Sequence, residues 1–207
     1  MTTRLLIARH GNTFRPGEIV TRVGTTDLPL VESGLLQGQK LGAYLKQHNW
    51  IPDVIFTSTL KRAIQTAEQA QIAMQTNLPT DALSIFNEID YGPDENQPED
   101  KVIARLGAEV LLTWETQATV PNGWKVDPHD IIKNWQDFSV KLIRDYAEKI
   151  ILVITSNGIA RFSPYLTGDF TTFSAKHRIK ISTGALCVFE KKLSSEQWDC
   201  LQWNIKP

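Results

Sequence analysis

A cluster of cationic, imidazole and amide groups follows a short apolar run near the start of the sequence. Residues 5–8 are all apolar, and Arg9, His10, Gly11 and Asn12 come directly after them. An apolar run of this length suits a strand buried on both faces, and open α/β sheets bind ligands at the carboxyl ends of their strands. A guanidinium, an imidazole and backbone N–H groups at one point suit a phosphoryl group, which His10 could attack through its ring nitrogen. An Arg-His pair that merely ends a strand is the plain alternative.

A second candidate cation follows the next predicted strand. Residues 53–57 indicate another short buried strand, and Ser58 or Thr59 is expected to cap the helix that follows. Arg62 falls in the first turn of that helix, where the helix dipole and unpaired N–H groups already favour anions. A solvated surface arginine is the ordinary alternative for Arg62. Arg22, in the loop after the first strand, is also available to reach the same site.

Acidic residues occupy a turn-rich segment in the middle of the chain, 87–95. Carboxylates beside a phosphate site are unfavourable unless one of them donates a proton. A carboxyl group near a bound anion, or removed from water, has its pKa raised and can act as a general acid. Glu88 is the candidate for this role, and an ordinary acidic surface loop remains the alternative.

Strands and helices alternate along the chain, which predicts a three-layer α/β sandwich. We interpret 1–207 as one domain, with a helical insertion or cap at 95–149 that contains one helix beginning at Pro98. The tryptophans of this insertion are expected to be core residues. The remaining strands are expected at 83–86, 150–155, 185–190 and 198–205, and the remaining helices at 34–48, 131–146 and just after the turn 156–158.

Composition restricts the classes of function. The chain has 42% hydrophobic and 22% charged residues and a net charge of −1, values typical of a globular protein. No basic run is present, so we expect no nucleic-acid partner, and no apolar segment is long enough to predict a membrane span or a signal peptide. The two cysteines, Cys187 and Cys200, have no metal or redox spacing and suit a reducing compartment. We therefore expect a cytoplasmic protein.

Together these motifs resemble the phosphoglycerate mutase-like branch of the histidine phosphatase superfamily. The resemblance lies in four blocks that cover most of the chain outside the helical insertion. The blocks are Arg9–Thr13 with Gly24–Leu30, Glu32 and Gly34; Ser58–Ala67; Glu88 with Gly92 and Glu95; and the strand 150–155 with its turn. The resemblance implies a three-layer α/β/α sandwich with a mostly parallel central sheet.

The resemblance also implies a mechanism. His10 would attack phosphorus in line and carry a transient phosphohistidine, while Arg9 and Arg62 would hold the phosphoryl oxygens. Glu88 would protonate the leaving alkoxide and then help to deprotonate the attacking water. The mechanism needs no metal and no other cofactor, because the two guanidinium groups supply the positive charge.

The chain departs from the family pattern at the turn after strand 150–155. The family has a second histidine there, and Ser156 stands at its position in this chain. A hydroxyl group can donate a hydrogen bond to phosphate but carries no charge, and losing one such donor costs on the order of a hundredfold in rate. Asn157 would compensate in part. Pro16 is a second departure, because related chains tend to have a phosphate-binding asparagine there.

These residues leave two functional hypotheses open. One is a phosphatase that hydrolyses a small phosphorylated metabolite through a phosphohistidine on His10, with activity reduced by Ser156. The other is a degenerate relative that binds phosphorylated ligands or a protein partner without turnover; a mutase is less favoured, and homo-oligomerisation is left open. The predicted site comprises the catalytic His10 and Glu88 and the phosphate-binding Arg9, Arg62, Ser156, Asn157, Asn12 and Arg22.

Overall fold

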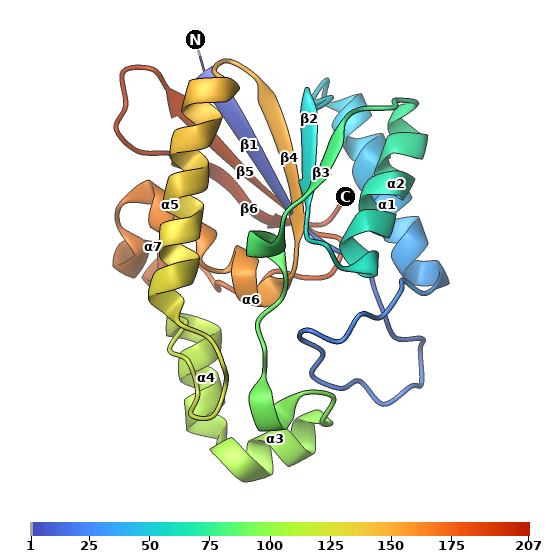
Figure 1. Cartoon of the computed structure of the whole chain (residues 1–207), viewed down its shortest axis with the longest axis vertical. Coiled ribbons are helices and arrows are strands. Elements are labelled where there is room, and N and C mark those ends of the chain that lie inside the picture. Colours follow the sequence, from blue (N-terminus) through green and yellow to red (C-terminus); the bar gives the residue numbers. More distant parts are fainter. Residues whose placement is uncertain (1) are drawn as a thin grey trace.

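Six strands form one sheet through the centre of the molecule, in the order β3-β2-β4-β1-β5-β6 (Figure 1). The computed structural model describes residues 2–207. The first four strands in this order are parallel, while β5 is antiparallel to β1 and β6 is antiparallel to β5. The predicted α/β fold with a mostly parallel sheet is therefore confirmed. The strands are β1 (Thr2–Arg9), β2 (Val54–Thr57), β3 (Thr80–Ala82), β4 (Ile150–Thr155), β5 (Leu186–Lys192) and β6 (Asp199–Ile205).

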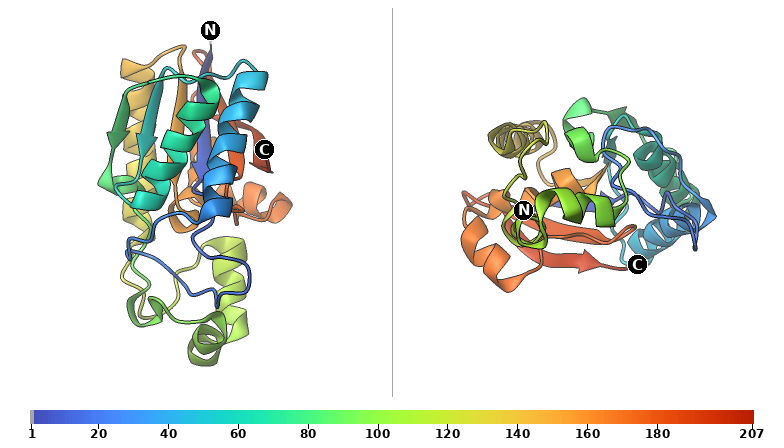
Figure 2. Two further views of the ribbon diagram at one scale, coloured as in Figure 1. Left: turned by 90° about the vertical axis from the view of Figure 1, so that its right-hand side faces the viewer. Right: turned by 90° about the horizontal axis from the view of Figure 1, so that it is seen from below.

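Helices cover both faces of this sheet and produce three layers (Figure 2). Alternate residues of β1 point to opposite faces, as the pleat of a strand requires. Leu6 and Ala8 pack towards α1 and α2, while Leu5 and Ile7 belong to the core on the side of α5. The helical elements are α1 (Glu32–Gln47), α2 (Lys61–Met74), α3 (Glu99–Leu106), α4 (Ala108–Gln117), α5 (Pro128–Asp145), α6 (Asn157–Ala160) and α7 (Phe170–Lys176), with 3-10 turns η1 (Ser84–Phe86), η2 (Gly92–Asp94) and η3 (Ser163–Thr167).

The segment 95–149 divides into two parts. Helix α5 packs on the sheet, where the Phe138 ring lies 5.1 Å from Phe56 and 5.0 Å from Phe86, measured between centroids. Helices α3 and α4 instead stand beyond the carboxyl ends of the parallel strands (Figure 1). Of the helices in this segment, only α3 and α4 therefore stand at the edge of the sheet where a ligand would enter. The three tryptophans of the segment are buried, as predicted.

Two local predictions are wrong. The helix expected to run on from Pro98 is two helices, because Gly107 has φ of 86°, a left-handed value that ends α3 before α4 begins. The helical spacing of apolar residues continues through 98–114, so the sequence pattern does not reveal this break. The edge strand expected at 83–86 is the turn η1, and the strand β3 lies just before it in an exposed polar stretch that carries no apolar signal.

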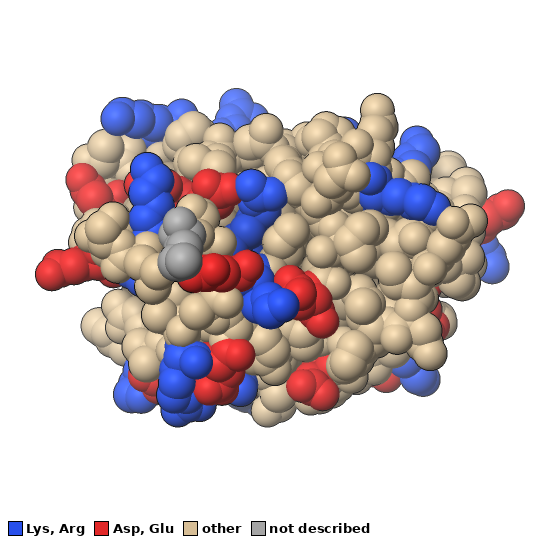
Figure 3. Space-filling view, turned by 90° about the horizontal axis from the view of Figure 1, so that it is seen from above, with Lys and Arg blue, Asp and Glu red and all other residues tan. Residues whose placement is uncertain are grey.

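The face at the amino ends of the parallel strands carries cations and anions side by side (Figure 3). Arg4 pairs there with Glu190, and Lys149 Nζ lies 3.0 Å from Asp53 Oδ1. This face therefore has no broad surface of one sign. Among the helices of residues 2–207, none has the length and apolar character needed to cross a membrane.

Candidate active site

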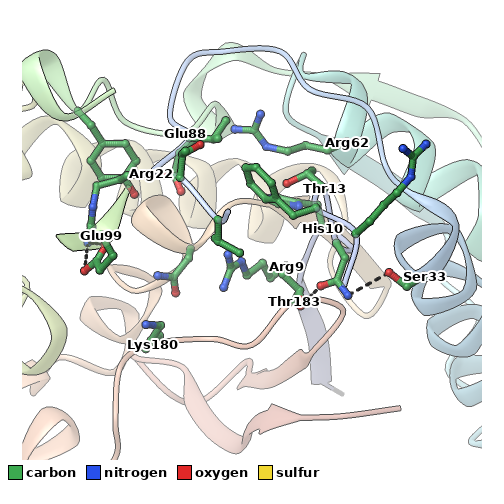
Figure 4. Close-up of a pocket in the computed structure, with 18 of the residues that line it drawn as sticks. Arg9, His10, Thr13, Arg22, Ser33, Arg62, Glu88, Glu99, Lys180 and Thr183 are labelled. Atoms are coloured by element: carbon green, nitrogen blue, oxygen red, sulfur yellow. Dashed lines mark hydrogen bonds and ion pairs between the residues drawn. The ribbon is translucent and has the colours of Figure 1, made fainter. Parts of the chain in front are cut away.

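A cavity of about 680 Å³ opens at the carboxyl ends of β1 and β4 (Figure 4). Its floor comes from the residues that follow β1 and β4 and from the start of α2. Its outer walls come from the loop between β1 and α1, from α3 and α4, and from the segment before β5. Arg9, Arg62 and Glu88 are grouped around His10 in this cavity (Figure 4). Chain segments far apart in sequence thus bring the predicted charged groups together.

The ring of His10 is held in the state that a nucleophile needs. Nδ1 lies 2.7 Å from the carbonyl oxygen of Gly11. Because a carbonyl oxygen only accepts, Nδ1 carries the proton and Nε2 keeps its lone pair. Burial, followed by repulsion from Arg9 and Arg62, holds the pKa of His10 well below its ordinary value. The imidazole is therefore neutral, with Nε2 free to bond to an electrophile.

Two guanidinium groups flank this imidazole, that of the buried Arg62 and that of the partly buried Arg9. Arg9 Nη1 donates to the carbonyl of Ile181 at 2.7 Å. Arg62 donates from Nη1 to the carbonyl of Thr26 at 2.7 Å and from Nη2 to that of Gly24 at 2.6 Å. Burial lowers the pKa of both groups and Glu88 opposes that shift, yet an arginine stays charged in a protein. The site thus holds two fixed positive charges suited to phosphoryl oxygens.

Glu95 fixes the carbonyl groups that hold Arg62. Its carboxylate accepts from the N–H groups of Gly24, at 3.0 and 3.1 Å, and of Thr26, at 3.0 Å, and from the Thr26 hydroxyl at 2.7 Å. These bonds fix Gly24 and Thr26, the two residues whose carbonyl oxygens accept from Arg62. The helix α2 that carries Arg62 has no cap from Ser58 or Thr59, contrary to the prediction. Asp27 Oδ1 instead accepts from the Lys61 N–H at 2.7 Å.

Replacing Glu95 by alanine is expected to lower the free energy of unfolding by about 1–3 kcal/mol, because several partly buried donors lose their acceptor. Arg62 loses its fixed position at the same time. Urea denaturation measures the effect, with Glu109→Ala as the control because Glu109 is an exposed residue of α4. Equal stability of the two variants would contradict this role of Glu95.

Glu88 lies at the cavity with its carboxylate anchored by backbone. Oε2 accepts from the N–H of Gly158 at 3.1 Å, and Oε1 accepts from its own neighbour Ile89 at 3.0 Å. Only glycine allows this approach, since a Cβ atom on residue 158 would lie 2.2 Å from Glu88 Oε1. The turn after β4 therefore sets the position of a carboxyl group that comes from a different segment.

The turn after β4 also carries the two predicted phosphate ligands Ser156 and Asn157, and only one of them reaches the cavity. Ser156 is fully buried, its hydroxyl has no hydrogen-bond partner among the described residues, and it is not part of the cavity lining. Asn157 does line the cavity. Its Oδ1 accepts from the Ile181 N–H at 2.8 Å, so its Nδ2 is the end left to donate. The predicted contact of Ser156 with phosphate is thus not supported, and Asn157 is the residue of this turn that reaches the site.

Asn12 and Arg22 also line the cavity, but both side chains are already engaged. Asn12 Oδ1 accepts from the Thr183 hydroxyl at 2.5 Å and its Nδ2 donates to Ser33 at 3.3 Å. The backbone N–H of Asn12 was expected to bind phosphate. It instead donates to Gln37 Oε1 at 2.8 Å and is not free to do so. Arg22 lies in the outer part of the cavity, bound to Glu99.

Arg161 was not predicted as part of the site. It is fully buried, its Nε donates to the carbonyl of Asn157 at 3.3 Å, and its Nη1 donates to that of Trp114 at 2.6 Å. Its guanidinium also lies 3.9 Å from the ring of Trp114. Arg161 therefore connects the turn after β4 to α4. The sequence did offer one signal for this contact. Arg161 lies four residues after Asn157, and residues four apart on a helix lie on the same face.

Other residues that line the cavity show no comparable signal in the sequence. Tyr91, Lys180 and Thr183 reach the cavity only through the fold, and burial raises the pKa of Tyr91. Among residues 2–207, no group of three or more His, Cys, Asp or Glu side chains is arranged to hold a metal ion. His10 is the only histidine of the described chain that lines the cavity.

Comparison with known proteins supports a common origin with enzymes that act on phosphate groups. Residues 5–206 match the family model described as the histidine phosphatase superfamily, branch 1. The chain is 31% identical over 131 residues to a 2,3-bisphosphoglycerate-dependent phosphoglycerate mutase of Bifidobacterium longum, covering 63% of this chain and 52% of the relative. It is 34% identical over 119 residues to the enzyme of that description from Clavibacter michiganensis, covering 56% and 47%. The chain thus spans about half the length of the curated relatives it matches.

Solved structures share the fold over its full extent. A mycobacterial glucosyl-3-phosphoglycerate phosphatase has a TM-score of 0.78 at 18% identity, covering 99% of both chains. A putative alpha-ribazole-5'-P phosphatase from Escherichia coli has a TM-score of 0.74 at 19% identity, covering 99% of this chain and 97% of that one. At these identities the likeness shows the fold alone. Because the family model covers nearly the whole sequence, the chain belongs to branch 1 of the histidine phosphatase superfamily.

Proposed function

We propose that the protein is a phosphatase that hydrolyses a small phosphate monoester through a phosphohistidine on His10. The observation that carries this proposal is the state of the His10 ring, whose Nε2 keeps its lone pair in a cavity flanked by the guanidinium groups of Arg9 and the buried Arg62. A neutral imidazole is a nucleophile for phosphorus, and paired cations stabilise the charge of the transferring phosphoryl group.

In the first step the His10 Nε2 lone pair bonds to phosphorus as the bond from phosphorus to the ester oxygen breaks. Arg9 and Arg62 bind the three other phosphoryl oxygens, whose charge they balance throughout the transfer. The Glu88 carboxyl gives its proton to the leaving oxygen, so that an alcohol departs rather than an alkoxide. The products of this step are the alcohol, a Glu88 carboxylate and a phosphohistidine.

In the second step water attacks the phosphohistidine from the side that the alcohol has left. The Glu88 carboxylate takes a proton from this water, the bond between Nε2 and phosphorus breaks, and inorganic phosphate leaves. In both steps the proton stays on Nδ1, which donates it in a hydrogen bond to the Gly11 carbonyl, and this bond keeps the ring oriented. Asn157 Nδ2 is a neutral donor for the phosphoryl group, in a turn where the family has a second histidine. We infer that activity is reduced for this reason.

The pH dependence of kcat/KM follows from the lowered pKa of His10. The free enzyme needs an unprotonated Nε2, and protonation sets in only well below pH 6.5 because the pKa lies well below that ordinary value. We expect kcat/KM to stay constant as the pH falls through 6.5 and to decrease only in more acidic solution. A pH profile with an aryl phosphate measures this, and a midpoint at or above 6.5 would contradict it.

The proposal is tested by phosphate release from 4-nitrophenyl phosphate and a panel of small phosphate esters. Steady release with several turnovers per protein molecule is the expected result. The alternative is a degenerate relative that binds phosphorylated ligands without turnover, which the absence of an imidazole from the turn after β4 favours. No release from any ester, together with calorimetric binding of inorganic phosphate, would establish that alternative. Transfer of a phosphoryl group between two positions of phosphoglycerate would instead indicate a mutase.

A further inference from the structure

Arg22 forms a fixed, neutralised pair in the outer part of the cavity (Figure 4). Its Nη2 lies 2.7 Å from both carboxylate oxygens of Glu99. Its guanidinium carbon lies 5.3 Å from the ring centre of Tyr91 and 5.2 Å from that of Trp124. The backbone is fixed as well, since the Arg22 N–H donates to the carbonyl of Gln97 at 2.9 Å. Arg22 therefore cannot swing towards a ligand without breaking these contacts.

Lys180 forms a second pair of the same kind across the cavity. Its Nζ lies 3.3 Å from Glu115 Oε2, and both residues line the cavity wall. Glu115 Oε1 also lies 3.9 Å from Arg161 Nη2, so the carboxylate is shared between two cations. As with Arg22, a cation that lines the outer part of the cavity has a carboxylate beside it.

The inner and outer parts of the cavity therefore differ in charge. Around His10 two cations, Arg9 and Arg62, face a single carboxylate, and this excess of positive charge suits a phosphate dianion. Farther out, each lining cation has a carboxylate within 4.0 Å. Glu99 pairs with Arg22, and Glu115 pairs with Lys180 as well as with the buried Arg161. The exposed Arg15 lies 3.8 Å from Glu18. A second anionic group on the substrate would meet these carboxylates without finding an unpaired buried cation, and such like-charge contact costs binding free energy.

A hydroxyl group suits such pairs, since it donates to a carboxylate and accepts from a guanidinium or ammonium N–H. Glu99 is half-exposed towards this space, with 55% of its side chain accessible. We propose that the enzyme prefers esters of neutral, hydroxyl-bearing alcohols over esters that carry a second anionic group, and that Glu99 sets this preference by neutralising Arg22. The proposal deepens the phosphatase function above and rests on it.

Two esters that differ in one group test this preference. Glycerol 3-phosphate and 3-phosphoglycerate differ only in a hydroxymethyl group that is replaced by a carboxylate. We expect kcat/KM for glycerol phosphate to exceed that for phosphoglycerate by about tenfold or more, the size of one unfavourable charge contact. In Glu99→Gln the ratio of the two kcat/KM values should fall by about tenfold, because the charge of Arg22 is released while its contacts with the rings remain.

Asp100→Asn is the matched control. Asp100 is the next residue of α3, is exposed, makes no ion pair with any described residue and does not line the cavity. Its loss changes the net charge by the same amount, so the ratio in this variant should equal that of the wild type. A loss of activity that affects both esters equally cancels in the ratio of their kcat/KM values.

The outcomes are distinguishable. A wild-type preference for phosphoglycerate, or a ratio unchanged by Glu99→Gln, overturns the inference while phosphatase activity on the two esters and on 4-nitrophenyl phosphate stands. An equal shift of the ratio in Asp100→Asn also overturns it, because net charge rather than the pair would be the cause. No turnover of any of the three esters overturns the phosphatase function itself, and the inference with it.

Discussion

Replacing His10 by alanine is expected to reduce phosphate release by at least about ten-thousandfold, since removal of a nucleophile eliminates the covalent path. Arg9 and Arg62 remain in the variant, but a guanidinium group is not a nucleophile. The Glu88 carboxyl is held by the N–H groups of Gly158 and Ile89 and serves as the proton donor. Asn157 does not substitute, because its free end is an amide donor. Initial rates with 4-nitrophenyl phosphate measure the loss.

His129→Ala is the control for this variant, since His129 is exposed at the start of α5 and does not line the cavity. It should keep wild-type activity. The thermal midpoints of both variants should stay close to that of the wild type, because within residues 2–207 the His10 ring has one hydrogen bond, to the neighbouring Gly11 carbonyl. Activity of His10→Ala within tenfold of the wild type would show that another group attacks phosphorus.

Replacing Glu88 by glutamine is expected to affect slow and fast leaving groups differently. An alkyl alkoxide needs a proton as it departs, whereas 4-nitrophenolate does not. General acid catalysis is worth about a hundredfold to ten-thousandfold, so hydrolysis of glycerol phosphate should fall by an amount in that range. The loss with 4-nitrophenyl phosphate should be smaller. It should come only from the second step, in which Glu88 no longer takes the proton from the attacking water.

Glutamine retains the size of Glu88 and one acceptor, so this variant can keep the bond from the Gly158 N–H that holds the turn after β4, while it loses the bond from the Ile89 N–H. Glu109→Gln, on the exposed side of α4, is the control for the charge change. An equal loss with both esters would show that Glu88 only positions the substrate. No loss with either would remove it from the mechanism.

The inner part of the site was predictable because its residues lie next to strands with a clear signal. The apolar runs of β1, β2 and β4 identify three strands, and parallel strands present their carboxyl ends at one edge of a sheet. Arg9, His10, Arg62 and Asn157 each follow such a run within a few residues. Their convergence at one cavity is therefore a consequence of topology that the sequence carries.

The outer part of the site was not predictable from local pattern. Glu99 is an exposed residue in a first helical turn, like many that bind nothing, and only the packing of the loop after β1 against the start of α3 places it on Arg22. Ser156 shows the opposite case, since its position after β4 is right for a ligand but its hydroxyl is directed into the protein. The backbone conformation after β4 directs Asn157, one residue later, into the cavity instead of Ser156. The pattern of apolar residues in the sequence does not show which of the two will reach the site.

The central claim is the covalent phosphohistidine, and the stereochemistry of hydrolysis tests it most directly. A phosphorothioate monoester, made chiral at phosphorus by its sulfur and two oxygen isotopes, is hydrolysed in water that supplies the third isotope, and the configuration of the released thiophosphate is determined. Each in-line transfer inverts phosphorus. Transfer to His10 followed by transfer to water therefore predicts overall retention. Net inversion would show that water attacks the ester directly and would contradict the account.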